Sequence, residues 1–175
     1  TANRGRGTPT YETVVGTLGF SSGRHYWEIK IDAYGHEEDI FGAFANKKLI
    51  KFARVESGGT WGWTCTSGKK MWPAGERVQS QSYGDYSKLN EVIGVLLEFR
   101  AVDGVASLTY FRNGNTLGKA FENIPAGTYF PCISMFNNEG TDVQITFKVD
   151  SAFKYTQIPD NKKIYTCNER GFGVL

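Results

Sequence analysis

Apolar and polar residues alternate with a period of two along several short segments of the chain. Successive side chains of a β-strand point to opposite faces of a sheet, so this alternation predicts strands with one buried face over 24–32 and 143–149. The expected buried sets are His25, Trp27, Ile29 and Ile31 in the first segment and Val143, Ile145, Phe147 and Val149 in the second. The residues between them in the first segment, expected on the polar face, are Tyr26, Glu28, Lys30 and Asp32.

Between these two segments lies a series of shorter apolar runs separated by turn signals. The predicted strands include 40–48, 60–66, 90–100, 105–112 and 128–136, and the sequence Asn-Gly-Asn at 113–115 is a strong hairpin signal. No segment sustains the i, i+3, i+4 spacing of an amphipathic helix, so little or no helix is predicted. Many short antiparallel strands in one domain favour a β-sandwich or a barrel.

Composition narrows the possible partners and cofactors. The chain has 175 residues, enough for one domain with a substantial core, and its 20 basic and 18 acidic residues nearly cancel. Lysine pairs are scattered rather than gathered in a run, so no nucleic-acid partner is predicted. Lys51 and Arg54 are predicted to be solvated, with an acidic partner as the alternative. The three cysteines, Cys65, Cys132 and Cys167, form no metal-binding or disulfide pattern, and no cofactor is predicted.

The segment GFSSG at 19–23 matches the G-x-S-x-G pattern of a serine nucleophile elbow. Such an elbow needs a helix directly after the serine, whereas the residues after Gly23 have a strand pattern. We therefore expect Ser21 to lie in a turn, and His25 to have a structural role. The acidic stretch after His36 is predicted to be a solvated loop rather than a metal site. These patterns predict that the chain is not an enzyme.

Seven motifs in order resemble one family, the SPRY domain. They are GFSSGRHYWEIKID (19–32), FGAF (41–44), WGW (61–63), SYGD (82–85), VIGVLLEF (92–99), LTYFRNGNTLGKAF (108–121) and YFPCIS (129–134). The resemblance implies an all-β fold, a bent antiparallel β-sandwich of about 10–13 short strands. It places the domain at 13–158, after a polar segment 1–12 that is disordered or an edge strand, and before an extension at 159–175.

The resemblance also implies a non-enzymatic protein–protein interaction domain that binds a short peptide or a protein loop through variable loops at one end. The residues at the matching positions, together with a neighbouring loop, are Trp72, Phe136, Asn137, Asn138, Tyr34 and His36. The parent protein would be a ubiquitin-ligase substrate receptor or would use the domain as a regulatory module. The isolated domain is expected to be a monomer in the cytoplasm or nucleus, with no membrane contact.

Each candidate residue also has a structural interpretation. Trp72 would cover the end of the core, Phe136 would be buried, and Asn137 and Asn138 would shape a turn. Trp61 and Trp63 alternate on one predicted strand and are expected in the core. Two alternatives to peptide binding stay open for the whole domain: a structural unit packed permanently against neighbouring domains, and a carbohydrate-binding sandwich.

Overall fold

The computed structural model of the chain describes residues 10–33, 49–54, 60–65, 67–74, 77–137, 144–148 and 165–166. Over these residues the backbone forms twelve strands and no helix. The strands are β1 (Thr10–Val15), β2 (Arg24–Ala33), β3 (Leu49–Arg54), β4 (Thr60–Thr64), β5 (Lys69–Ala74), β6 (Arg77–Ser82), β7 (Val92–Phe99), β8 (Ala106–Arg112), β9 (Asn115–Ile124), β10 (Tyr129–Asn137), β11 (Gln144–Lys148) and β12 (Tyr165–Thr166).

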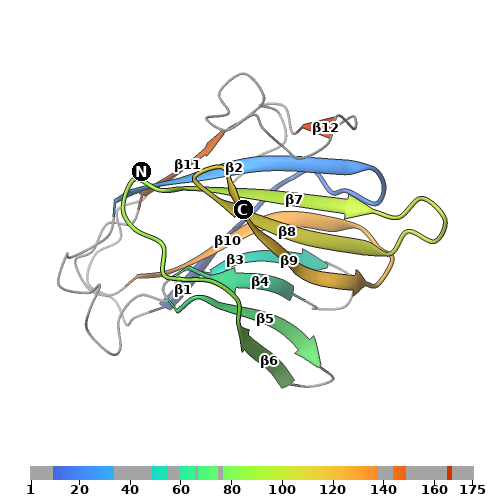
Figure 1. The fold of residues 1–175 in the computed structure, drawn as a ribbon, viewed down its shortest axis with the longest axis horizontal. Helices are drawn as coiled ribbons and strands as arrows, with labels where there is room; N and C mark the ends of the chain where they lie inside the picture. The colour runs from blue at the N-terminus through green and yellow to red at the C-terminus, as the bar shows by residue number, and fades with distance from the viewer. Residues whose placement is uncertain are drawn as a thin grey trace.

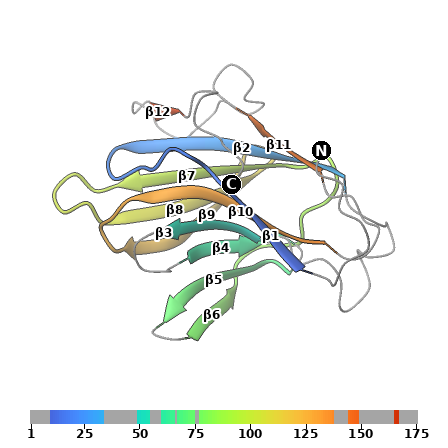
Figure 2. The same cartoon turned by 180° about the vertical axis from the view of Figure 1, so that it is seen from behind.

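The strands form two stacked sheets (Figure 1). The first sheet has the order β1-β10-β3-β4-β5-β6, and the second has the order β11-β2-β7-β8-β9, with β12 paired in parallel to β2. All other pairs are antiparallel. The view from behind shows the same arrangement, with β5 and β6 extending beyond β9 at the lower margin of the molecule (Figure 2). The all-β antiparallel sandwich predicted from the sequence is confirmed.

The core lies between the two sheets and is rich in aromatic residues. The four residues predicted for the inner face of β2 are all buried, and Trp27 is only 2% exposed. Trp63 on β4 is completely buried between Tyr83 and Tyr110, which confirms its predicted place in the core. Trp61, two residues earlier, is partly buried and packs edge-on against Tyr129. The alternation along β2 and β4 therefore fixed which side chains fill the sandwich.

The expected polar face of β2 is wrong at two positions. Tyr26 and Glu28 point away from the core but are 2% and 0% exposed, and Tyr26 packs edge-on against Phe111. The Tyr26 hydroxyl donates a hydrogen bond to Glu28 Oε1 at 3.2 Å, which satisfies part of the buried carboxylate. Gly94 on β7 makes room for this ring, because a Cβ there would lie 2.3 Å from Tyr26 Oη. These contacts of Tyr26 with β7 and β8 are tertiary, so the alternation along β2 does not reveal that part of its outer face is buried.

The hairpin between β8 and β9 has the turn that Asn-Gly predicted. Asn113 and Gly114 both have positive φ, 50° and 82°, which is the signature of a type I′ turn. The Asn113 side chain also accepts a hydrogen bond from the backbone N–H of Val92 at 3.0 Å. The turn is therefore tied to the start of β7 as well as joining its own strands.

Candidate protein-interaction surface

Trp72 lies on the β5–β6 hairpin, on the face that looks toward β9. Its indole packs against the edge of the Phe121 ring, with centroids 6.2 Å apart, and the side chain is partly buried. The hairpin continues past β9, the last strand of the second sheet (Figures 1 and 2). Among the described strands the second sheet ends at β9, and the Trp72 side chain stays partly exposed. This position combines a fixed aromatic side chain with access from solvent.

Lys70 is on the same face of β5, one alternation before Trp72, and it fastens the hairpin to the second sheet. Its Nζ donates a hydrogen bond to the backbone carbonyl of Ala120 on β9 at 2.8 Å. The same ammonium lies 5.9, 6.0 and 5.6 Å from the ring centroids of Trp72, Tyr83 and Phe121. Contacts at these distances are within the range of cation–π attraction. Lys70 thereby holds the three rings in one arrangement.

Tyr83 closes the other end of this aromatic group. Its hydroxyl donates to the carbonyl of Gly118 on β9 and accepts from the backbone N–H of Tyr110 at 3.4 Å. Burial of the phenol raises the pKa of Tyr83 to about 12, although the bond from Tyr110 acts in the opposite direction. The hydroxyl is therefore protonated at neutral pH and remains a donor to the β9 carbonyl.

The facing strand β6 contributes exposed polar side chains to the same surface. Gln79 is paired directly with Trp72, and Gln81 with Lys70, so each pair projects on one face of the hairpin. Both glutamines are exposed. We call the set Lys70, Trp72, Gln79, Gln81 and Tyr83 the Trp72 surface. It offers an aromatic ring next to amide donors and acceptors.

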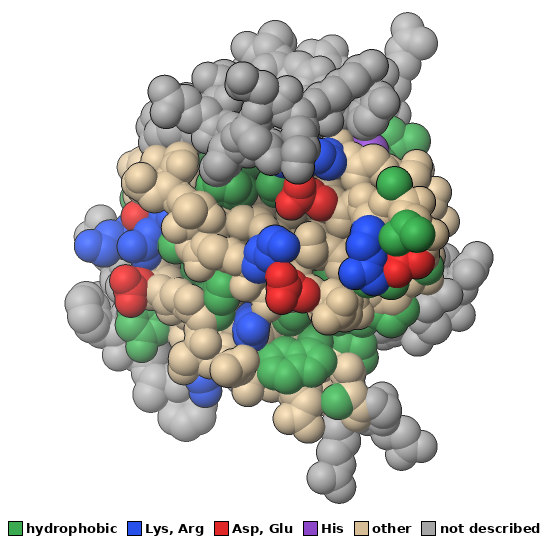
Figure 3. Space-filling model, turned by 45° about the vertical axis from the view of Figure 1, so that its right-hand side comes forward, with side chains coloured by type: hydrophobic (Ala, Val, Ile, Leu, Met, Phe, Trp, Pro, Cys, Tyr) green, Lys and Arg blue, Asp and Glu red, His purple; other side chains and the backbone are tan. Residues whose placement is uncertain are grey.

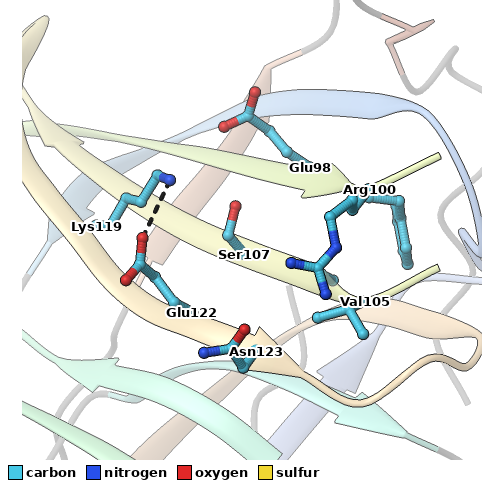
Figure 4. A pocket seen from close by; sticks show the side chains of 9 residues that line it. Glu98, Arg100, Val105, Ser107, Lys119, Glu122 and Asn123 are labelled. Carbon is cyan, nitrogen blue, oxygen red and sulfur yellow. Dashed lines mark hydrogen bonds and ion pairs between the residues drawn. The ribbon is translucent and has the colours of Figure 1, made fainter. Parts of the chain in front are cut away.

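A second feature is a shallow hollow of about 340 Å³ on the outer face of β7, β8 and β9 (Figure 4). Charged side chains that line it already have partners: Lys119 Nζ lies 3.1 Å from Glu122 Oε1, and Glu98 Oε1 lies 2.6 Å from Nε of Arg24 on β2. Figure 3 likewise shows basic and acidic side chains lying next to one another on this face. A charged ligand would have to displace these partners, so the Trp72 surface is the stronger candidate.

The family follows from the sequence pattern together with this sandwich. The family model of the SPRY domain matches residues 24–150, which is more than half of the chain. The chain belongs to the SPRY domain family. SPRY domains are in general protein-interaction modules and not enzymes, so the coarse function expected from the motifs is supported.

Comparisons with individual proteins agree with this assignment. This chain is 32% identical over 81 residues to the Set1/Ash2 histone methyltransferase complex subunit ASH2 of Drosophila melanogaster. That alignment covers 46% of this chain but only 14% of the relative. The SPRY domain of human HERC1 superimposes with a TM-score of 0.58 at 16% identity, covering 78% of this chain and 81% of that one. Another human SPRY domain gives 0.55 at 13% identity, with 82% and 86% covered. At these identities the structures show a shared fold.

Two further properties hold for the described part of this SPRY domain. No helix there is long and apolar enough to cross a membrane. Within the same residues, no group of three or more His, Cys, Asp or Glu side chains is placed to hold a metal ion.

The GFSSG segment has a structural role in this SPRY domain. Ser21 is exposed, and Gly23, with φ of 83°, turns the chain directly into β2. The His25 ring stacks on Phe20 at 3.8 Å between centroids, and its Nε2 lies 2.7 Å from the Ser22 carbonyl oxygen. These contacts agree with the structural role predicted for His25.

The remaining predicted binding residues lie elsewhere. Phe136 and Asn137 end β10, where their backbones pair with β1, and their side chains lie outside the description, as do Asn138, Tyr34 and His36 entirely. Strands β3 and β4 separate β10 from β5, which makes three strand spacings, or about 14 Å. The structure therefore does not bring Trp72 together with the end of β10. The binding roles of all six residues stay predictions.

The sequence reasoning did not select Lys70 and Tyr83. Period-two spacing in KKMW places Lys70 and Trp72 on one face of a strand, and this signal could have singled out Lys70. Their hydrogen-bond acceptors on β9 are 50 and 35 residues away in the sequence. Only the packing of one sheet on the other reveals those partners.

Proposed function

We propose that this SPRY domain binds an extended segment of another protein at the Trp72 surface. The observation that carries the proposal is the ring of Trp72, which contacts Lys70 and Phe121 and stays partly exposed. Binding energy in protein interfaces concentrates in such rigid aromatic anchors, surrounded by polar groups that pair with the ligand backbone. Gln79 and Gln81 supply those polar groups.

The end of β10 and its neighbouring loop form a separate proposed contact. It consists of Phe136, Asn137 and Asn138 with Tyr34 and His36, and it rests on the resemblance to SPRY proteins that use the corresponding positions. Because the end of β10 lies three strand spacings from β5, we treat the two sites as independent. Substitutions at both should then have additive effects on the binding free energy, to within about 0.5 kcal/mol.

At the level of the parent protein, we propose a substrate-receptor or regulatory role in the cytoplasm or nucleus. The support is the general role of SPRY domains in protein binding and the Drosophila relative, which is a subunit of a histone methyltransferase complex. A ubiquitin-ligase receptor is the specific form that we favour from the resemblance. Proximity labelling with the full-length parent protein, with and without the domain, tests this: unchanged labelled partners would contradict it.

The test of the Trp72 surface starts from a display library of ten-residue peptides selected on the wild-type chain. Trp72→Ala should weaken binding of the selected peptides by about 2 kcal/mol, or roughly 30-fold, as expected for an interface hot spot. Tyr86→Ala is the matched control, because Tyr86 is 66% exposed in the loop before β7 and lies outside the surface. It should bind like the wild type.

Trp72 also packs against the core, so its removal can destabilise the fold. Gln79→Arg gives a second test, because Gln79 is exposed and directly paired with Trp72. It should change peptide affinity without lowering the midpoint of thermal unfolding. If folded Trp72→Ala and Gln79→Arg both bind the selected peptides like the wild type, the Trp72 surface is not the binding site.

A further inference from the structure

β6 is the last strand of the first sheet, and one of its sides has no neighbour among the described strands. Its six residues pair with β5 in continuous register, from Lys69 opposite Ser82 to Ala74 opposite Arg77. In Figures 1 and 2, β6 lies at the lower margin of the molecule. All residues from 78 to 82 are exposed, and Val78 is 64% exposed. This strand is therefore an accessible sheet edge.

The hydrogen-bond register identifies the backbone groups on the open side. Tyr83 N–H donates to the carbonyl of Gly68 at 2.9 Å, which extends the β5–β6 pairing. Hydrogen-bonded pairs alternate in an antiparallel ladder, so Gln81 and Gln79 also direct their N–H and C=O groups toward β5. Pro73, which has no N–H, lies opposite Val78, in agreement with this alternation. It follows that the backbone groups of residues 78, 80 and 82 point away from β5.

The edge strand of the second sheet, β9, is not available for pairing with a further strand. Its carbonyls at Gly118 and Ala120 accept hydrogen bonds from Tyr83 and Lys70, and the Gly118 N–H donates to Thr116 Oγ1 at 3.0 Å. Its register with β8 shifts at three places. Capped carbonyls and register irregularities prevent a further strand from pairing with an edge.

β6 shows none of these protections between residues 78 and 82. This stretch, VQSQS, contains no charged residue and no proline, and its pairing with β5 has no register shift. Natural sheets normally protect exposed edges with charges, prolines or bulges, because a regular open edge pairs with other strands. The contrast with β9 indicates an edge that is kept available for a partner.

The charge of the surrounding strands indicates the chemistry of that partner. The four adjacent strands β3 to β6 contain five basic residues and no acidic residue, although the whole chain carries a net charge of only +2. The five are Lys51, Arg54, Lys69, Lys70 and Arg77. Electrostatic complementarity favours an acidic segment on this half of the sheet.

We propose that β6 binds an acidic extended segment of a partner protein, which joins the first sheet as an additional strand. The proposal rests on the proposed function, because the same hairpin carries Trp72, and it specifies how the ligand is held. Main-chain bonds to residues 78, 80 and 82 would supply affinity, as in other cases of strand addition. Alternate ligand side chains would lie next to Val78 on one face and next to Gln79 and Gln81 on the other, so a β-branched residue suits the Val78 position.

A proline scan of the edge tests the proposal. Ser80→Pro removes an outward N–H and leaves the ladder to β5 intact, since proline is tolerated where the N–H faces away from the ladder. Ser80→Ala is the matched control. The probe is a fluorescent decapeptide of alternating valine and glutamate, measured by fluorescence anisotropy. We expect Ser80→Pro to bind it at least tenfold more weakly than the wild type, Ser80→Ala to bind within twofold, and a valine–lysine decapeptide to bind at least tenfold more weakly.

A second measurement does not depend on the folding of the proline variant. Decapeptides N-methylated at every valine, or at every glutamate, lose donors on one edge only. One of the two should lose binding to the wild type at least tenfold and the other should retain it. Equal binding of both N-methylated peptides, or no binding of the unmodified acidic peptide, overturns the added strand.

The remaining outcomes separate the two proposals. If Trp72→Ala weakens binding and Ser80→Pro does not, strand addition is wrong while the Trp72 surface stands. If Ser80→Pro weakens binding and Trp72→Ala does not, strand addition stands and the anchor is wrong. A wild-type dimer that Ser80→Pro converts to a monomer would identify a second copy as the occupant and overturn the acidic partner. Duplex DNA that competes with the peptide equally in the wild type and Ser80→Pro would show polyanion binding instead.

Discussion

The close approach of Tyr26 to Gly94 gives a sharp test of how the outer face of the second sheet is packed. In Gly94→Ala the new Cβ would lie 2.3 Å from Tyr26 Oη and 2.9 Å from Cζ, far inside van der Waals contact. The ring cannot yield easily, because Tyr26 is 2% exposed, packs on Phe111 and donates a hydrogen bond to Glu28. Either β7 moves away from β2 or the tyrosine leaves its site.

Both responses cost stability. Overpacking a well-packed site costs about 1–3 kcal/mol. Displacing the ring also breaks the hydrogen bond to the buried Glu28 carboxylate, and bonds to charged groups contribute about 1.5–3 kcal/mol. We therefore expect Gly94→Ala to lower the free energy of unfolding by about 3 kcal/mol.

Urea denaturation at pH 7, followed by tryptophan fluorescence, measures this change. Gly84→Ala is the control, because its new Cβ would meet only ordinary contacts, 3.5 Å to Leu117 Cδ1 and 3.7 Å to Trp63 Cζ2. It should lower stability by less than about 0.5 kcal/mol. Tyr26→Phe removes the atom at 2.3 Å, so the double variant with Gly94→Ala should show a favourable coupling of about 1 kcal/mol or more. If Gly94→Ala and Gly84→Ala are equally stable, the steric reasoning is refuted.

Three further predictions concern turns and ionisable groups. Asn113→Ala should lower the free energy of unfolding by about 1–2 kcal/mol, because it strains a positive φ and removes the acceptor for Val92 N–H; an unchanged urea midpoint would contradict this. The pKa of Tyr83 is raised to about 12, so its contribution to stability is complete below pH 10 and is lost as pH rises through 12. Tyr83→Phe should flatten the decline of the urea midpoint over that range, and an equally steep decline would exclude this role for Tyr83. Arg100 holds the pKa of Asp103 below its usual value, so the stability difference between wild type and Asp103→Asn should be present at neutral pH and vanish in acid; a difference independent of pH would rule out the ion pair.

Variants at Trp72 and at Ser80 separate binding by an aromatic side chain from binding by the backbone of an edge strand. Trp72→Ala removes an aromatic side chain, whereas Ser80→Pro removes a backbone donor on β6, which β5 separates from β4. Measuring both variants on the same peptides distinguishes side-chain recognition from main-chain recognition.

The sequence alone determined the all-β class of the fold, the core-facing residues of β2 and β4, and the hairpin turn at Asn113. These features depend on local rules: period-two alternation sets which side chains face the core, and Asn-Gly accepts the positive φ of a tight turn. The ordered motifs also identified the SPRY family. Local rules sufficed for the strands and the turn because each involves residues adjacent in the chain or across one turn.

Only the tertiary structure decided what lies on the far side of each strand. The Tyr26 ring fits beside β7 because Gly94, more than sixty residues later, leaves room for it, and both Tyr26 and Glu28 are buried. Lys70 and Tyr83 became part of the candidate surface because β9 brings backbone carbonyls within their reach. β6 is an edge because the order of the described strands ends there. Which strand neighbours which, and where a sheet stops, follows from the packing of the whole chain, because a strand's own sequence specifies its two faces and leaves its neighbours undetermined.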